Sequence, residues 1–285
     1  MATMARDSYL TVSIDVSYGS RRILQCDELS FPIGSIVGVL GRNGAGKTTL
    51  LKCITGLFPT NGISWHTESR VSALIETPRF RLDWTGTQHL EYQSRLNSAS
   101  MDGLRPVIEQ TGLESFVEQK VGTYSLGQKQ RLGIAKALIA KPDCLILDEP
   151  TNGLDPQGIA QIRTLIQNLH KQGMNIILSS HLLGEVEACC THLVVIGDQK
   201  VQYSGAIEGY SQTGIHIQSQ NSTDLLAFVQ AQSWEHTTLR DGLLITESIA
   251  ADTINRMCFE AGITLSHLSL YESSLEDNFI GGVNE

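Results

Sequence analysis

Residues 41–48 read Gly41, Arg42, Asn43, Gly44, Ala45, Gly46, Lys47 and Thr48, and this stretch decides the fold of the 285-residue chain. An apolar, strand-like run from Ser35 to Leu40 precedes it, and a helix-like run from Thr49 to Gly56 follows. Three glycines let the backbone turn tightly and direct successive N–H groups at one anion, and the following helix adds the positive end of its dipole. Lys47 supplies a cation for β- and γ-phosphates, and Thr48 supplies a hydroxyl for the accompanying Mg²⁺. The stretch predicts a phosphate-binding loop, with an unliganded glycine-rich turn as the alternative.

Two carboxylates follow a second buried strand about a hundred residues downstream. Cys144 to Leu147 is continuously apolar, as expected of a strand buried on both faces, and Asp148 and Glu149 come directly after it. A further apolar strand, Asn175 to Leu178, leads to His181. Hydrolysis of a phosphoanhydride needs such groups together at the carboxyl ends of parallel strands. Asp148 is suited to bind Mg²⁺, Glu149 to orient the attacking water, and His181 to reach the γ-phosphate. The alternatives are that the two acids are ordinary residues at the sheet edge and that His181 is a loop histidine without a role.

A second anion site is predicted at Ser125, Leu126, Gly127 and Gln128. Ser125 is placed to cap a helix whose apolar positions recur with helical spacing until Pro142. The N-terminus of a capped helix favours an anion, yet a single ATP already has a complete binding loop upstream. A second phosphate sensor is best explained if two copies of the chain enclose two ATP molecules head to tail.

An alternating segment precedes the phosphate-binding loop. Tyr9 to Phe31 alternates apolar and polar residues and predicts an antiparallel hairpin. Its turn contains Tyr18, about thirty residues before Lys47. A turn tyrosine most often packs against its own domain, but beside a phosphate-binding loop it is a candidate platform for the adenine ring.

Length and charge divide the chain into two parts. We expect a main domain over residues 1–210 and a small accessory or regulatory domain over residues 211–285, whose pattern has the order βαββαβ. The net charge is −9, and residues 211–285 hold 10 acidic and 2 basic residues. No basic face is visible, which argues against nucleic acid as a partner.

The cysteines, the apolar runs and the N-terminal residues indicate in which cellular compartment the chain is expected. The six cysteines lie in mostly apolar contexts without metal-ligand spacing, which indicates buried thiols in a reducing compartment. No apolar run approaches the ~20 residues that cross a bilayer, and Met1 to Asp7 lacks the apolar core of a secretion signal. We expect a cytosolic chain without direct membrane insertion, or one held at a membrane only through a partner.

Taken in order, these motifs resemble those of the ATP-binding subunits of ATP-binding cassette (ABC) transporters, over roughly residues 9–205. Tyr18 resembles the adenine-stacking aromatic, and Gly41 to Thr48 resembles the Walker A loop, with Thr49 directly after it as a further nucleotide contact. Ser125 to Gln128 resembles the signature motif, and Cys144 to Glu149 resembles Walker B with its catalytic glutamate. Asn152 to Pro156, which contains Asp155, resembles the D-loop, and His181 resembles the switch histidine. The resemblance implies an α/β fold, a P-loop NTPase of ABC ATPase type. Its sheet core is mostly parallel, with an N-terminal antiparallel subdomain, a helical subdomain at about residues 77–140 and a small α+β C-terminal domain.

The sequence differs from the common pattern of the family at two motifs, and these differences indicate which branch of the family it resembles. Glu76 stands where most members have a glutamine, so the resemblance implies Glu76 as a metal ligand beside Thr48 and Asp148. The signature reads Tyr-Ser-Leu-Gly at residues 124–127, where many members have Leu-Ser-Gly-Gly. Both variants, together with the closing segment Ser274 to Phe279, resemble bacterial drug and antimicrobial-peptide exporters, including bacitracin-type and lantibiotic self-immunity systems.

The resemblance implies an ATPase that uses ATP and Mg²⁺, with Glu149, His181 and Lys47 in the hydrolytic step. The implied partners are a membrane permease, which holds the chain at the cytoplasmic face of the cell membrane, and a second copy of the chain or a related ATPase subunit. We expect Phe80 and Trp84, within Thr77 to Tyr92, to form the permease-docking cleft, with packing of the helical subdomain as the alternative. A soluble ABC-type ATPase that acts on a cytosolic protein or on nucleic acid is the competing function, and a structural role with an inactive nucleotide site is a third.

Overall fold

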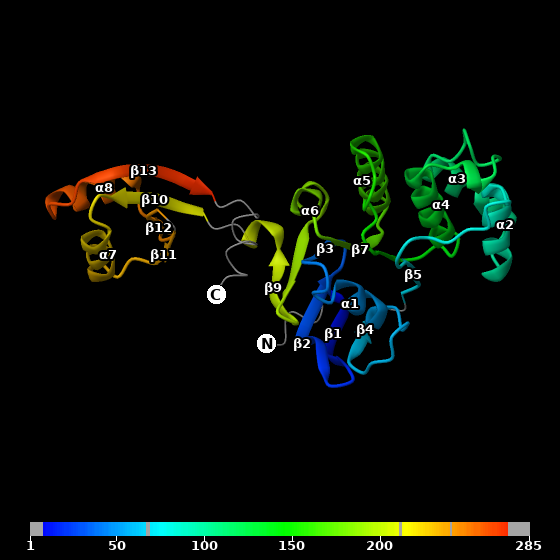
Figure 1. Cartoon of the computed structure of the whole chain (residues 1–285), viewed down its shortest axis with the longest axis horizontal. Coiled ribbons are helices and arrows are strands. Elements are labelled where there is room, and N and C mark those ends of the chain that lie inside the picture. The colour runs from blue at the N-terminus through cyan, green and yellow to red at the C-terminus, as the bar shows by residue number, and fades with distance from the viewer. Residues whose placement is uncertain (1–7, 67–68, 211–212, 240, 273–285) are drawn as a thin grey trace. The chain divides into compact units, whose positions relative to one another are not determined.

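The computed structural model describes residues 8–66, 69–210, 213–239 and 241–272 (Figure 1). The chain divides into two compact units, Met1–Ile207 and Glu208–Glu285. The segment Ser274 to Phe279, named above in the resemblance, lies outside the described residues.

Among the described residues the first unit contains a nine-stranded sheet in the order β4-β1-β2-β9-β8-β3-β7-β6-β5. Its strands are β1 (Ser8–Tyr18), β2 (Arg21–Pro32), β3 (Ile36–Gly41), β4 (Ile63–Trp65), β5 (Val71–Leu74), β6 (Cys144–Leu147), β7 (Asn175–Ser180), β8 (His192–Gly197) and β9 (Lys200–Ala206). The neighbours β8, β3, β7, β6 and β5 are parallel, whereas β1 pairs antiparallel with β2 and β4, and β9 pairs antiparallel with β8. The expected parallel core and N-terminal antiparallel part are both present.

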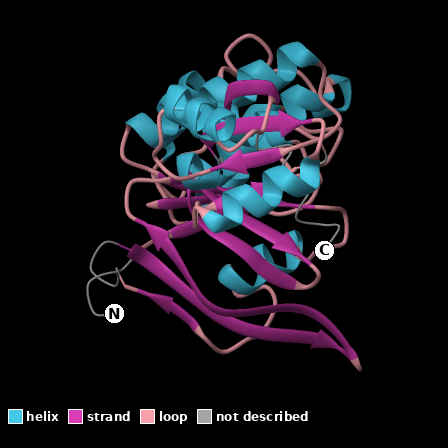
Figure 2. Cartoon of the chain, turned by 90° about the vertical axis from the view of Figure 1, so that its left-hand side faces the viewer, coloured by secondary structure: helices cyan, strands magenta, loops and turns pink. Residues whose placement is uncertain are grey.

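The first unit also contains helices, which Figure 2 colours cyan beside the magenta strands. They are α1 (Lys47–Ile54), α2 (Gly86–Leu96), α3 (Leu104–Thr111), α4 (Leu126–Leu138), α5 (Pro156–Lys171) and α6 (Leu183–Cys189), with single 3₁₀ turns at Met101–Gly103, Val121–Thr123 and Ile207–Tyr210. The helices α2, α3 and α4 pack on one another as a separate group that contacts β5 through α4 (Figure 1). The helix α5 contacts β7, and α6 contacts both β3 and β7. In the described part of the chain, no helix combines the length and the apolar character that crossing a bilayer requires.

Between Gly112 and Tyr124 the chain forms turns and no α-helix. Gly112 ends α3 in the left-handed conformation at φ 63°, and the chain continues as turns to the 3₁₀ turn at Val121. The segment is held by bonds to other elements: the Thr87 N–H donates to the Val117 carbonyl, and the Val121 N–H donates to the Trp84 carbonyl. Together with local turn bonds, such as the Val117 N–H to the Leu113 carbonyl at 2.8 Å, these tertiary bonds hold the segment.

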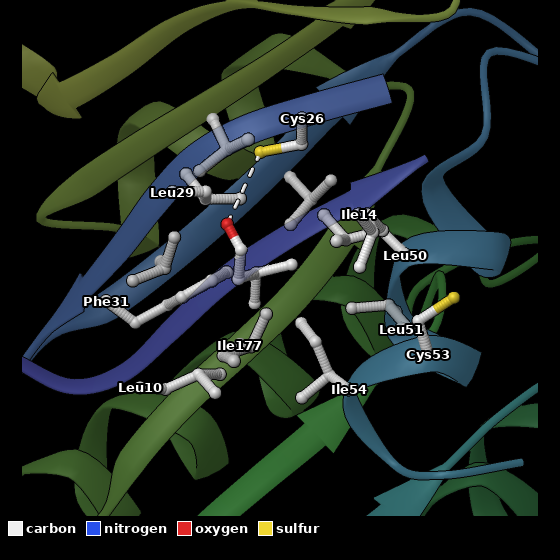
Figure 3. Close-up of a cluster of buried hydrophobic side chains, with 14 of the residues drawn as sticks. Leu10, Ile14, Cys26, Leu29, Phe31, Leu50, Leu51, Cys53, Ile54 and Ile177 are labelled. Carbon is white, nitrogen blue, oxygen red and sulfur yellow. Dashed lines mark hydrogen bonds between the residues drawn. The ribbon is translucent and has the colours of Figure 1, made fainter. Parts of the chain in front are cut away.

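The core of the first unit fixes the position of α1. Leu50, Leu51 and Ile54 on α1 are buried against apolar side chains of β1 and β2 and against Ile177 of β7 (Figure 3). Burial of a leucine or isoleucine side chain stabilises the fold by about 1.5–3 kcal/mol. The helix that begins at Lys47 is therefore anchored along its whole length.

The second unit has its own sheet and core. Its elements are β10 (Thr213–Ser219), α7 (Ser222–Ala231), β11 (His236–Thr238), β12 (Leu243–Ile245), α8 (Ala251–Glu260) and β13 (Leu265–Glu272). The strands form an antiparallel sheet in the order β11-β12-β10-β13. Ile217, Leu225, Ile245 and Ile254 are buried in one cluster, so the unit has a hydrophobic core that is separate from that of the first unit.

Candidate nucleotide-binding and hydrolysis site

Three adjacent parallel strands bring the predicted residues to one edge of the sheet. The strand β3 pairs with β7, and β7 pairs with β6, so their carboxyl ends lie side by side. The end of β3 leads into Gly41 to Thr48, the end of β6 into Asp148 and Glu149, and the end of β7 into His181. The geometry therefore joins motifs that lie more than a hundred residues apart in the sequence.

The backbone of residues 41–48 depends on glycine at two positions. Gly44 and Gly46 have φ values of 83° and 110°, where other residues are strained. Around Gly44 no heavy atom lies within 4 Å of the place that a Cβ would occupy, and a Cβ on Gly41 would lie 2.8 Å from the Ile196 carbonyl oxygen. Gly46 precedes α1 without a side-chain cap, so capping side chains do not occupy the first N–H groups of the helix. This backbone fits a phosphate chain.

The side chains that follow the loop contact both carboxylates. The Lys47 Nζ donates to the Gly41 carbonyl at 2.8 Å and lies 3.2 Å from Glu149 Oε1, and its side chain is only 6% exposed. Thr48 Oγ1 donates to Asp148 Oδ2 at 2.8 Å. Thr49 lies in the first turn of α1, and Arg42 and Asn43 are exposed at the tip of the loop.

Glu149 is held from several directions. Its Oε2 lies 3.1 Å from His181 Nδ1, and its N–H donates to Ser179 Oγ at 2.9 Å. The backbone of Glu149 is left-handed, with φ 45°, a conformation that costs about 1–3 kcal/mol outside glycine. Contacts with Lys47, Ser179 and His181 hold Glu149 in this strained conformation. The carboxylate lies between the Lys47 ammonium and the His181 imidazole.

Ser179 is a site residue to which the sequence analysis gave no role. Its hydroxyl accepts from the Glu149 N–H and donates to Asp148 Oδ1 at 2.6 Å, and its side chain is fully buried. The signal available in the sequence was a pair of serines directly after the apolar run of β7. A hydroxyl at the end of a buried strand needs a partner, and here the partner is the Walker B-like carboxylate.

The Ser125 region forms a separate hollow. Ser125 caps α4 as expected: its Oγ accepts from the Gln128 N–H at 3.2 Å, and Gln128 Oε1 accepts from the Ser125 N–H at 2.9 Å. Asp155 caps α5 by accepting from the Gly158 N–H at 3.0 Å. A cavity of about 290 Å³ lies between them, lined by Ser125, Leu126, Gly127, Gln128, Arg131, Gly153, Leu154, Asp155, Gln157, Gly158 and Gln161. Among the described residues no hydrogen bond or ion pair joins Ser125 to Gly41–Thr48.

Two further candidate residues lie at the surface. Tyr18 ends β1 and is 80% exposed. Glu76 is also exposed, and its Oε1 lies 2.6 Å from Lys52 Nζ, a hydrogen bond that lowers the pKa of the Glu76 carboxyl. The structure thus pairs Glu76 with Lys52, whereas it joins Thr48 directly to Asp148.

The described part of the chain contains no cluster of three or more His, Cys, Asp and Glu side chains that could hold a metal by itself. Thr48 and Asp148 offer a hydroxyl and a carboxylate next to the phosphate-binding loop. Mg²⁺ is commonly bound by one or two protein oxygens together with substrate phosphates and water, so this sparse donor set fits an ion that arrives with a nucleotide.

Comparison with known proteins decides the family. The family model described as ABC transporter matches residues 24–152. The bacitracin transport ATP-binding protein BcrA of Enterococcus faecalis is 36% identical over 301 residues, which cover 95% of this chain and 96% of that protein. The chain belongs to the ABC transporter ATP-binding family.

Other members agree with this assignment. The lantibiotic transport ATP-binding protein SrtF of Streptococcus pyogenes is 36% identical over 203 residues, 67% of this chain and 89% of that protein. A solved structure titled as the ATP binding subunit of an ABC transporter is 26% identical with a TM-score of 0.62 and covers 71% of this chain and 92% of its own. The predicted P-loop NTPase fold of ABC ATPase type, and the resemblance to the bacitracin and lantibiotic branch, are confirmed. ABC ATPases hydrolyse ATP to drive transport, so the predicted enzyme class is confirmed as well, and the nucleotide is ATP.

Proposed function

We propose that the chain is the ATP-hydrolysing subunit of a bacterial exporter that moves an antimicrobial peptide or a drug through a separate membrane permease. The similarity to the bacitracin transport protein supports the substrate class, because it extends over nearly the full length of both chains. The observation that carries the hydrolytic part is the placement of Glu149 between Lys47 and His181. In this arrangement the permease holds the chain at the cytoplasmic face of the cell membrane.

Each residue of the site has a distinct task in the proposed reaction. Glu149 orients and deprotonates the attacking water, and His181 both aligns the Glu149 carboxylate and reaches the γ-phosphate. Thr48 and Asp148 would hold Mg²⁺, which would supply positive charge to neutralise the phosphates. Glu76 would join this shell only after leaving Lys52, so its metal role is weaker than its position in the sequence implies.

Lys47 connects ATP binding to the activation of Glu149. Lys47 Nζ lies 3.2 Å from Glu149 Oε1 and donates to the Gly41 carbonyl, so these two acceptors share its single positive charge. An ATP phosphate competes for the same ammonium, because a phosphate carries more negative charge than one carboxylate. Occupation of the loop therefore releases Glu149 to act on water.

A second cassette completes the site. The Ser125 hollow and the loop at Gly41 to Thr48 are separate within one chain, so Ser125, Gly127 and Gln128 serve the nucleotide of a partner cassette. Asp155 lines the same hollow and belongs to the same contact. Tyr18 provides a flat, exposed ring for the adenine. The partner is a second copy of this chain or a related ATPase subunit.

The permease docks in a cavity of about 310 Å³ beside β5 and α4. Its lining includes Arg79, Phe80 and Lys136 and contains no carboxylate. Burial lowers the pKa of the Lys136 ammonium, whose Nζ lies 5.5 Å from the centre of the Phe80 ring. A permease segment that fits this cavity offers an apolar side chain and an acidic group. Trp84 packs against His89 and Tyr92 and does not line the cavity, so Phe80 is the better docking candidate of the two.

Copurification of the chain with a candidate membrane permease tests the proposal. In lipid nanodiscs, bacitracin-like or lantibiotic-like peptides should raise ATP hydrolysis severalfold, whereas unrelated peptides should not. Phe80→Ala should lower permease retention about tenfold with basal hydrolysis unchanged, since buried aromatic anchors dominate interfaces. Leu82→Ala is the matched control, because Leu82 is 59% exposed on the same segment but does not line the cavity. Recovery of a cytosolic protein in place of a permease would favour the soluble-ATPase alternative.

A further inference from the structure

Glu185 occupies an unusual position near the hydrolytic residues. It lies on α6, four residues after His181, and its Oε2 accepts from two hydroxyls, Thr151 Oγ1 and Ser180 Oγ, the latter at 3.0 Å. Its other oxygen, Oε1, is buried without a hydrogen-bond partner among the described residues. Glu185 also lines a small, mostly apolar cavity of about 70 Å³ beside Pro150 and Thr151.

This arrangement is unfavourable as packing alone. A buried carboxylate oxygen without a partner loses its hydration and gains nothing in return. An apolar side chain of similar size would fill the same space without that cost. The two hydroxyl contacts of Oε2 are therefore the feature that distinguishes a glutamate here.

The two hydroxyls belong to the segments that position the hydrolytic residues. Thr151 lies two residues after Glu149, in a turn closed by the Asn152 N–H to the Glu149 carbonyl at 3.1 Å. Ser180 is the residue directly before His181. Glu185 Oε2 thus joins the chain that leaves Glu149 to the chain that enters His181, independently of the 3.1 Å contact between Glu149 and His181 themselves.

We propose that Glu185 is a positioning residue for ATP hydrolysis, which sets the distance and orientation of Glu149 relative to His181 through Thr151 and Ser180. The proposal rests on the hydrolytic roles assigned to Glu149 and His181 above. The left-handed backbone of Glu149 strengthens it, because a strained residue keeps its conformation only where the flanking segments are fixed. The acceptor function of the side chain is what matters here, and its charge is not required.

Steady-state hydrolysis by the full chain separates positioning from binding. Glu185→Ala should lower kcat about 10- to 100-fold, since a small misplacement of reacting groups has an effect of that size. The KM for ATP should stay within about threefold, because the phosphate-binding loop is untouched. Glu185→Gln should restore kcat to within about threefold, since its amide oxygen can accept the same two hydroxyls. Glu187→Ala is the matched control, because Glu187 is exposed on the same helix.

A double-mutant cycle tests the connection itself. Thr151→Val should lower kcat on its own, yet have little further effect in the Glu185→Ala background, because both changes remove the same bond. If Glu185→Ala fails to fold, as judged by circular dichroism, Glu185→Gln and the pair Thr151→Val with Ser180→Ala carry the test. Wild-type kcat in Glu185→Ala, a Glu185→Gln variant as impaired as Glu185→Ala, or an additive Thr151→Val effect would each overturn the proposal.

Glu149→Gln measured in parallel keeps the two claims distinguishable. If Glu149→Gln stops hydrolysis while Glu185→Ala has no effect, only the role of Glu185 is wrong. If Glu149→Gln hydrolyses ATP normally, the proposed hydrolytic role itself is wrong.

Discussion

At the scale of single residues, Ser179 joins the two carboxylates of the site through one hydroxyl. Its proton is directed at Asp148 Oδ1, and its lone pair accepts the Glu149 N–H. Because the side chain is fully buried, water cannot replace either bond when the hydroxyl is removed.

We therefore expect Ser179→Ala to weaken both hydrolysis and the response to Mg²⁺. The loss of one buried hydrogen bond to a charged group corresponds to about 1.5–3 kcal/mol, or about a 10- to 150-fold change. A titration of ATPase activity with Mg²⁺ measures it, with Ser64→Ala as the control because Ser64 is exposed on β4. An unchanged Mg²⁺ dependence would show that Ser179 does not support Asp148.

The backbone of the proposed phosphate-binding loop was predictable because it depends on residues close together in the sequence. Gly44 and Gly46 shape the backbone, and Lys47 begins the helix that directly follows. All three lie within eight residues, so their spacing in the sequence is enough to indicate the loop. Ser179 and Glu185 contact Glu149 and Thr151, which lie about thirty positions away, so a pair of serines after an apolar run and a glutamate on a helix do not by themselves reveal these partners in the sequence. The pairing of Glu76 with Lys52 is likewise a tertiary contact that the motif order does not reveal.

At the scale of elements, α2 and α4 begin with the same capping box. Thr85 and Gln88 on α2 exchange bonds of 3.2 and 2.9 Å, and Ser125 and Gln128 on α4 exchange bonds of the same two lengths. The N-terminus of α4 lines the 290 Å³ hollow, and that of α2 does not. Comparing substitutions at the two capping residues, Thr85 and Ser125, therefore distinguishes the loss of a helix cap from the loss of a nucleotide contact.

Ser125→Arg should abolish hydrolysis without weakening ATP binding to the isolated chain, because the hollow that serves the partner cassette is filled. Thr85→Arg removes an equivalent cap and should cost about 1 kcal/mol of stability with hydrolysis retained. ATPase assays and thermal unfolding of both variants provide the measurement. If Ser125→Arg and Thr85→Arg lose the same amount of ATPase activity, the loss results from the missing helix cap alone.

Strand ends were predicted less well than strand identities. The apolar run predicts a strand that ends at Leu178, but β7 continues through Ser179 and Ser180 because both pair with β3, opposite Val39 and Leu40. Hydrophobicity marks the buried part of a strand, whereas the backbone ladder extends as far as the neighbouring strand allows. The functional hydroxyls lie in that extension.

At the scale of the whole molecule, the site residues and the excess charge lie in different parts of the sequence. The described site residues all belong to the first unit, and residues 211–285 hold 10 acidic and 2 basic residues. We propose that the second unit stabilises or regulates the cassette dimer. Leu270 on β13 is 86% exposed and is available for such a contact.

A chain that ends after Tyr210 should fold and bind ATP, with dimerisation altered in affinity or in salt dependence. This boundary keeps β9 complete, because Ala206 pairs with His192. Repulsion between acidic units is screened over ~10 Å at 0.1 M salt, so removal of the unit should flatten the dependence of dimerisation on ionic strength. Nucleotide binding and sedimentation across a salt series are the measurements. Loss of ATP binding in the shortened chain would make the second unit part of the main core.

In the proposed cycle two cassettes enclose ATP, and Glu149 ends this state by activating water. Sedimentation of Glu149→Gln with saturating ATP and Mg²⁺ tests it most directly. The substitution keeps the shape of the side chain and removes the charge that polarises the water, so hydrolysis should fall by orders of magnitude while binding persists. We expect a stable dimer with two bound ATP molecules, which dissociates when nucleotide is removed. A monomer at saturating ATP would contradict it.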